Sequence, residues 1–356
     1  MSFSFPVGAM EEFFKEKIVL ITGGTGNIGR EFVRFLADQA EPEQIRVLSR
    51  TRSSQERFRH EFNDQIEKRL IDLRTGNLTN RKDLQAVVRD VDIAIHLAAL
   101  PKVEGCEERP TEAVEVNIIG TLNLIEALER VDCQRAVAIS TVKACNPEHV
   151  YGMTKNLMER IVCDRPGSGK TNFSVVRIGN VIGEGQSGVI NAWHEKAANG
   201  GTLEIFDDNA TLYFLPISQT IQLINYALTT SDPGEIITRP MHAIKLTDLA
   251  EVMTVHYPPE RKGRGEDNAY KCGKGRPGWR SYDELVAETE VAYAEERQAD
   301  EEIFYCINPN RKSTHPLGTE FIAGINSKTD DPLAKEHIEE ILIESGVGPP
   351  HPKNVK

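Results

Sequence analysis

The sequence is poor in the features that mark secreted, membrane-spanning or metal-binding proteins. Its 356 residues include only six cysteines, which lie far apart and form no Cys-x-x-Cys pair. This spacing argues against a disulfide framework or a metal site and favours a reduced, cytoplasmic protein. No run of about 18 apolar residues occurs, so no membrane span is expected. The start, MSFSFPVGAMEEFFKEK, has an acidic flank and does not resemble a secretion signal.

Positive charge is also scarce. Lys and Arg number 42 against 54 Asp and Glu, which gives a formal net charge of −12. A protein with this balance is not expected to bind nucleic acid or an anionic membrane surface. An anionic ligand would therefore need a local positive site. The length suffices for one large domain or two modest ones.

A glycine-rich turn follows the first strongly apolar segment. Residues 17–22, KIVLIT, are typical of a buried parallel strand, and the amphipathic segment REFVRFLADQ begins at residue 30. Between them, glycines permit a tight turn, a close approach to a pyrophosphate at the helix N-terminus, and close packing of helix on strand. The alternative is a simple helix-capping loop. The predicted dinucleotide contacts here are Gly23, Thr25, Gly26, Asn27, Ile28 and Gly29.

The second predicted strand, 45–49, ends without the carboxylate that holds the ribose 2′-hydroxyl in many NAD-binding folds. Ser49, Arg50, Thr51 and Arg52 stand there instead. Because a guanidinium suits a 2′-phosphate, the sequence predicts NADP rather than NAD, with Ser49, Arg50 and Arg52 in the site. The alternative is that both arginines are solvated surface charges.

Strand-like and helix-like segments alternate up to about residue 182, with a third strand expected near 68–73 and a helix over 111–129. This alternation predicts an α/β protein with a Rossmann-type doubly wound parallel sheet. Ligands of such sheets bind at the carboxyl ends of the strands. We expect His96 to pack within its strand. For Asn117, a purely structural role is the alternative to contact with the cofactor. The further predicted cofactor contacts are Asn77, Leu78, Ala98, Ala99 and Asn117.

The segment 140–155, STVKACNPEHVYGMTK, carries the candidate catalytic residues. Tyr151 and Lys155 are four residues apart and so share one face of a helix. The lysine can hydrogen-bond a ribose and lower the pKa of the phenol, which makes Tyr151 a usable base. The spacing alone arises often by chance, and a solvated helix face is the alternative. The ligand-binding motifs at neighbouring strand ends favour the catalytic interpretation.

Beyond residue 182 the alternation loosens, and glycine, proline and aromatic residues increase. We expect residues 1–182 to form the cofactor domain, 183–345 a smaller substrate-binding subdomain interleaved with the last strands of the sheet, and 346–356 a tail. The segment 258–281 is strongly basic. It is either a solvated loop or a clamp for a substrate phosphate that includes Arg276.

Together these motifs resemble the extended short-chain dehydrogenases/reductases, and most of all the inverting UDP-N-acetylglucosamine 4,6-dehydratases and related polysaccharide-biosynthesis proteins. LITGGTGNIG is similar to their LITGGTGSFG, and HLAALPKV to HAAALKHV. ISTVKACNPEHVYGMTK is similar to LSTDKAANPINLYGATK, and VVRIGNVIG to VVRYGNVVG. The resemblance covers most of the chain. It implies a nucleotide-sugar substrate, UDP-linked, and a homo-oligomer.

The resemblance also implies roles for individual residues. Tyr151 would remove the proton of the sugar C4 hydroxyl as hydride passes to NADP⁺, Lys155 would hold the nicotinamide ribose, and Thr141 would hydrogen-bond the C4 oxygen. In the dehydratases an Asp–Lys pair directly after the threonine then removes the C5 proton and protonates the leaving C6 hydroxyl. The substrate contacts expected in this chain are Lys102, Asn180 and Arg276.

One member of that pair differs in this chain. Val142 stands where the dehydratases have Asp, while Lys143 is kept as a catalytic candidate. Valine cannot donate a proton, and loss of one positioned acid costs about 10²–10⁴-fold in rate. We therefore expect an enzyme that oxidises the sugar at C4 and then epimerises or reduces the ketone. Two alternatives stay open. One is an NADP(H)-binding sensor without turnover, and the other is a 4,6-dehydratase whose acid is Glu104, Glu107, Glu148 or His149.

Overall fold

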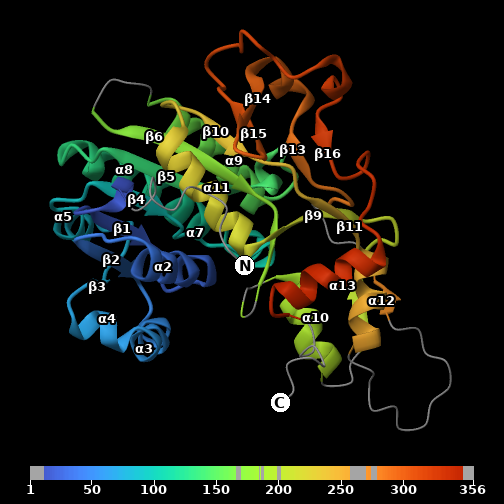
Figure 1. Ribbon diagram of the computed structural model, residues 1–356, viewed down its shortest axis with the longest axis horizontal. Helices are drawn as coiled ribbons and strands as arrows, with labels where there is room; N and C mark the ends of the chain where they lie inside the picture. Colours follow the sequence, from blue (N-terminus) through green and yellow to red (C-terminus); the bar gives the residue numbers. More distant parts are fainter. Residues whose placement is uncertain are drawn as a thin grey trace.

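The computed structural model describes residues 12–165, 170–183, 185, 188–198, 202–256, 270–273 and 279–347. Its largest element is a sheet with the strand order β14-β15-β10-β6-β5-β4-β1-β2-β3 (Figure 1). The strands from β3 through β10 run parallel, and β15 and β14 continue the sheet antiparallel at one edge. The chain builds outward from β1 to β2 and β3, then returns to β4 on the other side of β1. This reversal confirms the predicted doubly wound sheet.

The strands of this sheet are short and mostly buried on both faces. The third strand begins at Ile71, slightly later than the sequence pattern predicts. The bounds are β1 (Ile18–Thr22), β2 (Gln44–Ser49), β3 (Ile71–Thr75), β4 (Ile93–His96), β5 (Arg135–Thr141), β6 (Asn172–Ile178), β10 (Ile236–Thr238), β14 (Ala294–Ala299) and β15 (Glu302–Ile307).

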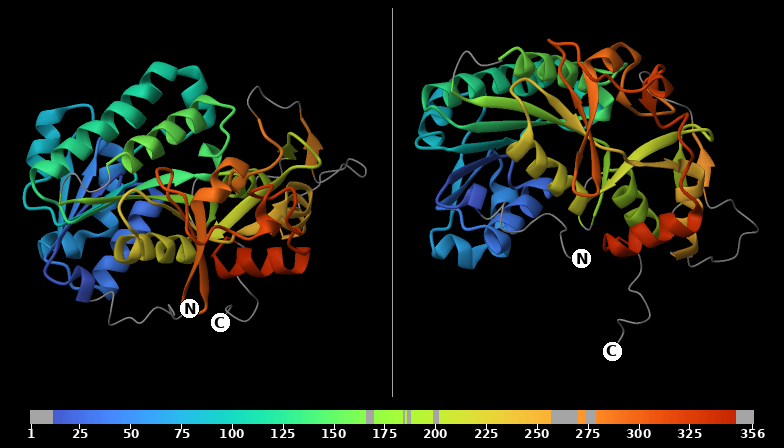
Figure 2. Two further views of the ribbon diagram at one scale, coloured as in Figure 1. Left: turned by 90° about the horizontal axis from the view of Figure 1, so that it is seen from above. Right: turned by 45° about the horizontal axis from the view of Figure 1, so that its top comes forward.

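Helices cover both faces of the sheet, as Figure 2 shows in its left view. One face packs against α5 (Arg81–Val87), α8 (Gly120–Arg130) and α9 (Val150–Cys163). The other packs against α2 (Asn27–Gln39), α3 (Arg52–Glu61) and α11 (Ile217–Thr230). Within β1, Leu20 lies in the first core while Val19 and Ile21 lie in the second. This alternation follows from the two-residue period of a strand and explains its continuous apolar sequence.

The helix predicted over 111–129 has a more complex form. It consists of α7 (Pro110–Val114), a π-helical turn η1 (Glu115–Ile119) and α8. A π-turn inserts a residue into the helical ladder and occurs often beside functional sites. Here it contains Asn117. Two shorter helices, α4 (Asn63–Glu67) and α6 (Val103–Glu108), complete this half of the described chain.

The C-terminal part adds smaller sheets, of which two surround a third apolar core and one packs against the first core. The strands β7 (Asn180–Ile182), β9 (Thr211–Pro216) and β11 (His242–Lys245) form one sheet, while β8 (Leu203–Ile205) pairs with β12 (Tyr270–Cys272) and β13 (Glu284–Val286) with β16 (Ile325–Asn326). The helical elements here are α10 (Val189–Ala198), α12 (Leu246–His256), η3 (Glu288–Tyr293), η4 (Thr319–Phe321) and α13 (Lys335–Glu344). Because β10, β14 and β15 return to the main sheet, the two parts of the chain are interleaved.

A buried ion cluster joins these two parts. The guanidinium of Arg177 on β6 is fully buried and contacts Glu159 on α9 at 2.7 Å and Glu290 on η3 at 2.8 Å. It also donates to the carbonyl of Leu285 on β13 at 2.7 Å. Three elements that are distant in sequence therefore share one buried charge, and the position of β13 is fixed relative to β6.

Candidate active site

The glycine-rich turn has the close backbone packing that its sequence predicts. Gly23 has a φ of +70°, and a Cβ there would lie 2.7 Å from the backbone nitrogen of Ala98. A Cβ at Gly29 would lie 2.5 Å from the Cα of Gly24. Gly26 caps α2 without any side-chain hydrogen bond to the helix. The turn therefore leaves the first amide groups of α2 uncovered by its own side chains, an arrangement that fits a pyrophosphate.

The end of β2 lies against this turn. The hydroxyls of Ser49 and Thr25 are 2.8 Å apart, and Ser49 is buried. Arg50 and Arg52 are both exposed, and Arg50 forms an ion pair with Glu112 at 3.6 Å. Arg52 is the first residue of α3, which follows β2 directly at the carboxyl edge of the sheet. The two arginines are thus near the predicted position of an adenosine ribose.

The other predicted cofactor contacts line the same edge, with one clear structural role among them. Asn117 is buried, accepts a hydrogen bond from the backbone of Leu100 at 2.7 Å and donates to the Thr154 hydroxyl at 3.0 Å. It thereby fastens the loop after β4 to α9, which is the structural alternative that its apolar surroundings suggested. Ala98 and Ala99 lie half-buried on that loop. Asn77 lies half-buried in the segment after β3.

Leu78 is buried against the π-helical segment. A Cβ at Gly120 would lie 2.9 Å from the Cβ of Leu78, so the two elements pack closely. His96 is confirmed as a packed strand residue, since its ring bridges Thr22 at 2.7 Å and Thr121 at 2.9 Å. Burial, with a smaller effect of nearby Lys155, lowers the pKa of His96 to about 3. It is therefore a neutral part of the core near neutral pH.

The candidate catalytic residues gather where β5 ends. Thr141 accepts a hydrogen bond from the Lys143 backbone at 3.3 Å and so starts a short 3₁₀ turn, η2 (Val142–Ala144). His149 caps α9, because its Nδ1 accepts a hydrogen bond from the backbone of Gly152 at 2.9 Å. A Cβ at Gly152 would lie only 2.3 Å from the carbonyl oxygen of Lys143. A glycine directly after Tyr151 is thus required for the turn and the helix to meet.

The Tyr–Lys pair has the predicted helical placement but different electrostatics. Lys155 is buried and donates to the carbonyl of Ile139 at 2.6 Å, and burial lowers its pKa to about 8. Burial, followed by the charge of nearby Cys106, raises the pKa of the Tyr151 phenol above its ordinary value. The lowering expected from Lys155 is absent in this conformation, because the ammonium is turned toward the strand.

A cavity of about 420 Å³ opens beside this cluster. Val142 and Lys143 form part of its wall, so the position that differs from the dehydratases faces the cavity. It is lined by residues of α6, η2, the α9 cap and the segment before β13: Val103, Glu104, Glu107, Glu108, Val142, Lys143, Glu148, His149, Leu212, Trp279, Arg280, Tyr282 and Asp283.

All four candidate substitute acids line this cavity. Glu107 accepts a hydrogen bond from the backbone of Val150 at 2.7 Å, and Glu148 forms an ion pair with Arg280 at 3.8 Å. His149 is the α9 cap described above. Glu104 also lines the cavity. These side chains therefore help to hold α9 and its cap in place.

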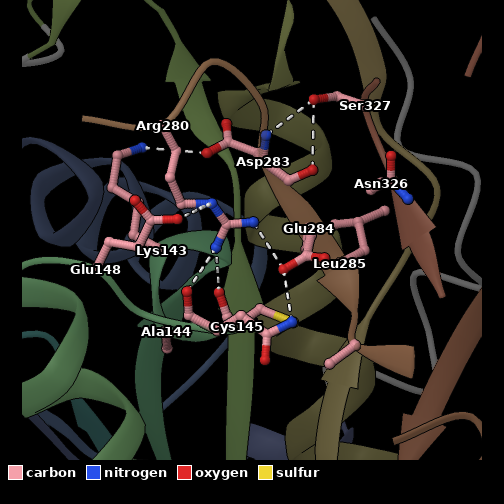
Figure 3. A network of polar contacts seen from close by, with 12 residues as sticks. Lys143, Ala144, Cys145, Glu148, Arg280, Asp283, Glu284, Leu285, Asn326 and Ser327 are labelled. Atoms are coloured by element: carbon pink, nitrogen blue, oxygen red, sulfur yellow. Dashed lines mark hydrogen bonds and ion pairs between the residues drawn. The ribbon is translucent and has the colours of Figure 1, made fainter. Parts of the chain in front are cut away.

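The surroundings of Lys143 include a residue that the sequence did not reveal. Lys143 Nζ lies 3.8 Å from a carboxylate oxygen of Asp283 (Figure 3). It also donates to Asn180 Oδ1 at 3.2 Å. Asn180 in turn donates to the other Asp283 oxygen at 3.1 Å. No motif surrounds Asp283 in the sequence, and only folding brings it to β5. Asn180, predicted to contact substrate, is a direct partner of Lys143.

Arg280 is a second residue that sequence reasoning missed. Its guanidinium donates to the carbonyls of Cys145 at 2.7 Å and Asn146 at 2.8 Å, and it pairs with Glu284 at 2.7 Å (Figure 3). It therefore clamps the loop between η2 and α9 onto the segment before β13. The other predicted substrate contacts are less informative, since Lys102 is exposed at the start of α6 beside the cavity-lining Val103 and Arg276 lies outside the described residues.

Comparison with known proteins agrees with this architecture. A family model described as polysaccharide biosynthesis protein matches residues 19–305. The X-ray structure of Pen from Bacillus thuringiensis superposes with a TM-score of 0.81 at 29% identity, covering 93% of this chain and 99% of that one. The family match and this structure span both the main sheet and the C-terminal sheets.

Similar sequences carry several names. An uncharacterized membrane protein of Methanocaldococcus jannaschii is 34% identical over 339 residues, or 94% of this chain and 98% of that protein. In the parts of this chain that the structure describes, no helix combines the length and apolar character needed to cross a membrane. The inverting UDP-N-acetylglucosamine 4,6-dehydratase of Campylobacter jejuni is 31% identical over 245 residues, 67% of this chain and 72% of that enzyme.

Epimerases are also among the similar proteins. The UDP-glucose 4-epimerase of Rickettsia massiliae is 28% identical over 289 residues, which are 80% of this chain and 81% of that enzyme. Family match, sequence similarity and shared architecture thus point the same way. The chain belongs to the polysaccharide biosynthesis protein family, within the extended short-chain dehydrogenase/reductase superfamily of nucleotide-sugar epimerases and dehydratases.

Proposed function

We propose that this chain oxidises a nucleotide-linked sugar at C4 and then epimerises or reduces the resulting ketone. The observation that carries the proposal is the cavity wall beside the Tyr–Lys pair, where Val142 and Lys143 lie together. A lysine can move a proton at C5, but an adjacent valine cannot protonate a leaving C6 hydroxyl. This combination favours C5 chemistry or reduction without the usual elimination.

The cofactor we propose is NADP, which supplies a hydride acceptor when bound. The glycine turn would hold its pyrophosphate, because Gly23, Gly26 and Gly29 keep side chains away from the amides of α2. Arg50 and Arg52 would hold the 2′-phosphate, since no carboxylate stands at the end of β2. Among structural neighbours of lower identity, MoeE5 and a dTDP-glucose 4,6-dehydratase are described as NAD complexes. The proposal of NADP rather than NAD therefore rests on Arg50 and Arg52.

In the proposed oxidation, Tyr151 accepts the proton of the C4 hydroxyl while Thr141 donates a hydrogen bond to the same oxygen. A phenol acts as a base only when a nearby cation stabilises its anion. Lys155 would provide that cation by turning from the Ile139 carbonyl toward the phenol and the ribose. The helical spacing of Tyr151 and Lys155 permits this movement without any backbone change.

The proposed substrate is a UDP-linked hexose or N-acetylhexosamine. Support comes from the names of the similar dehydratase and epimerase, both of which refer to UDP-sugars. Lys102 and Arg276 stay proposed phosphate contacts. A cavity of about 420 Å³ is within the usual range for small-molecule sites.

The test is product analysis by NMR in deuterated water, with UDP-N-acetylglucosamine, UDP-glucose and their 4-keto-6-deoxy derivatives as substrates. A stereoisomer with deuterium at the inverted carbon supports epimerisation, and consumption of NADPH by a keto sugar supports reduction. Binding of NADP(H) without turnover of any candidate would contradict the proposal and favour a sensor.

A second candidate function is 4,6-dehydration with a substitute acid. It is supported by the position of Glu104, Glu107, Glu148 and His149 on the cavity wall. The same NMR experiment distinguishes it, because dehydration gives a 4-keto-6-deoxy sugar that carries deuterium at C5. Substitution of each candidate acid by its amide, or of His149 by Asn, would then identify the donor.

We also propose that the chain forms a homo-oligomer through α9 and the neighbouring η1 segment. Met153 and Leu157 on α9 are 51% and 50% exposed, and Val114 and Ile119 are 46% and 44% exposed. Exposed apolar side chains on adjacent helices favour association. Sedimentation of the wild type and of Leu157→Glu tests this, with a shift to the monomer expected in the variant. A wild-type monomer would refute it.

A further inference from the structure

We infer that Asp283, which lies on a distant segment of the chain, is the positioning carboxylate of Lys143. This inference rests on the proposed function, because it assigns a role within the same site. The juxtaposition of Lys143 Nζ and Asp283 Oδ1 on the cavity wall carries it.

The Asp283 carboxylate is held firmly. It is 5% exposed, and one oxygen accepts hydrogen bonds from the Asn180 side chain and the Tyr213 backbone, both at 3.1 Å. The Asp283 backbone donates to Ser327 Oγ at 2.9 Å. Two donors on one oxygen leave the second oxygen directed at Lys143, as Figure 3 shows. An ionised carboxylate with these donors is a fixed partner for an ammonium group.

Asn180 makes the arrangement cooperative. Its side-chain oxygen accepts from Lys143 at 3.2 Å, and its nitrogen donates to Asp283 at 3.1 Å. The amide therefore orients both charged groups with the correct atom toward each. A carboxylate with a purely structural role would need only the contact to the Tyr213 backbone. The additional contact to a half-buried lysine that lines the cavity indicates a role in the site.

Two other carboxylates of the cavity have different partners. Glu107 accepts from the backbone of Val150 at the N-terminus of α9, and Glu148 pairs with Arg280. Asp283 forms an ion pair with Lys143.

The chemistry balances without any additional reactant. Once C4 is a ketone, the amine form of Lys143 takes the C5 proton, and the C5–H bonding electrons move into the carbonyl to give an enolate. The ammonium formed on Lys143 then lies against the Asp283 carboxylate. Return of a proton from Lys143 to the same face of C5 restores the ketone with retained configuration and allows exchange with solvent deuterium, whereas inversion takes its proton from water on the opposite face. Asp283 acts through Lys143 and does not contact the reacting atoms.

The test compares Asp283→Asn with Glu284→Gln, a matched loss of charge at the next residue, which contacts Asn146 and Arg280. Two rates are measured on one substrate: C4 oxidation from the nicotinamide absorbance, and C5 exchange from deuterium uptake. In Asp283→Asn we expect C5 exchange to fall roughly 10²-fold and C4 oxidation to change less than about 2-fold. Glu284→Gln should leave their ratio unchanged. An unchanged ratio in Asp283→Asn would overturn the inference.

A rescue experiment separates the charge effect of Asp283 on Lys143 from general support of the fold. Val142→Asp in the Asp283→Asn background places a carboxylate next to Lys143 and should restore most of the C5 exchange. If Val142→Asp is active alone but gives no rescue in this background, Asp283 does not act as the carboxylate of Lys143.

A final measurement needs no substrate. Reductive methylation with isotopic formaldehyde, read by peptide mass spectrometry, reports how freely Lys143 reacts. Loss of its partner in Asp283→Asn should raise the methylation rate of Lys143 several-fold, with Lys335 as an internal standard. Equal rates in all proteins would overturn the pairing. If the wild type oxidises no nucleotide sugar, the proposed function fails, and this rate still decides the relation of Asp283 to Lys143.

Discussion

The cofactor side and the substrate side of the sheet edge are built in different ways. On the cofactor side, Gly23, Gly26 and Gly29 lie within one turn, and their packing follows from the absence of side chains. On the substrate side, Lys143 meets Asp283, and Arg280 clamps the loop at Cys145, although each pair is far apart in the chain. One side therefore depends on local geometry, while the other depends on the docking of the C-terminal segment.

This difference explains why the two sides can vary independently. A local turn keeps its shape as long as its glycines remain, whatever is attached at the other end of the chain. A site assembled from several segments can exchange a residue in one segment for a residue in another. Val142 and Asp283 come from two such segments, and both line one cavity.

The largest effect is expected from Tyr151→Phe, which tests the cofactor side. Removal of the phenol hydroxyl should lower C4 oxidation by about 10²–10⁴-fold, because no other described group replaces this base. Binding of NADP⁺ should change less than about 2-fold, since the glycine turn is untouched. Single-turnover absorbance and a fluorescence titration measure the two quantities. Full oxidation activity in the variant would refute the catalytic assignment.

Glu290→Gln should weaken the buried ion cluster that joins the main sheet to the C-terminal part of the chain. It leaves the fully buried Arg177 with Glu159 as its remaining ionic partner. Breaking a buried pair of this kind costs about 3–5 kcal/mol of unfolding free energy. Urea unfolding measures the loss. A change below about 1 kcal/mol would show that β13 docks without this cluster.

The same pair predicts a pH dependence. Although burial opposes it, Arg177 lowers the pKa of Glu290 from 4.5 to about 2. The carboxylate therefore contributes its full stability above pH 4.5, and the contribution disappears as pH falls toward 2. Wild-type stability should decline more steeply than that of Glu290→Gln across this window. Parallel curves would contradict the assignment.

Gly152→Ala tests the contact between η2 and α9 on which the substrate side is built. The new methyl group would meet the Lys143 carbonyl at 2.3 Å, and we expect a cost of about 1–3 kcal/mol from overpacking. Gly105→Ala on α6 is the matched control, because its Cβ would meet no atom closer than 3.5 Å. This control should be neutral or slightly stabilising. Thermal unfolding compares the two, and equal midpoints would argue against the close contact.

The smallest effect concerns cofactor preference. Arg52→Ala should weaken NADP⁺ binding roughly 10-fold and leave NAD⁺ binding unchanged, since a charged hydrogen bond contributes about 1.5–3 kcal/mol. Arg59→Ala, also exposed on α3, controls for the loss of one positive charge. Isothermal titration measures both affinities. Tighter binding of NAD⁺ than of NADP⁺ by the wild type would remove the basis of this prediction.

Much of the cofactor side was predictable because its signals are short. The strand–turn–helix pattern correctly predicted β1, the glycine turn and α2, and the packed role of His96 was also expected. The sequence did not indicate the partner where a side chain had a choice of partners. Asn117 holds the loop after β4, and Lys155 faces Ile139, because tertiary packing offered each of them a nearby backbone group.

The residues alone were enough to predict the doubly wound sheet, the glycine turn, and a helix face shared by Tyr151 and Lys155 soon after the strand that ends at Thr141. Each of these depends on residues within one strand, one turn or one helix. Only the tertiary structure decided which carboxylate faces Lys143 and how Arg280 joins the two parts of the chain. The physical reason is that a charge selects its partner by distance and burial, and both are fixed only when distant segments have packed together.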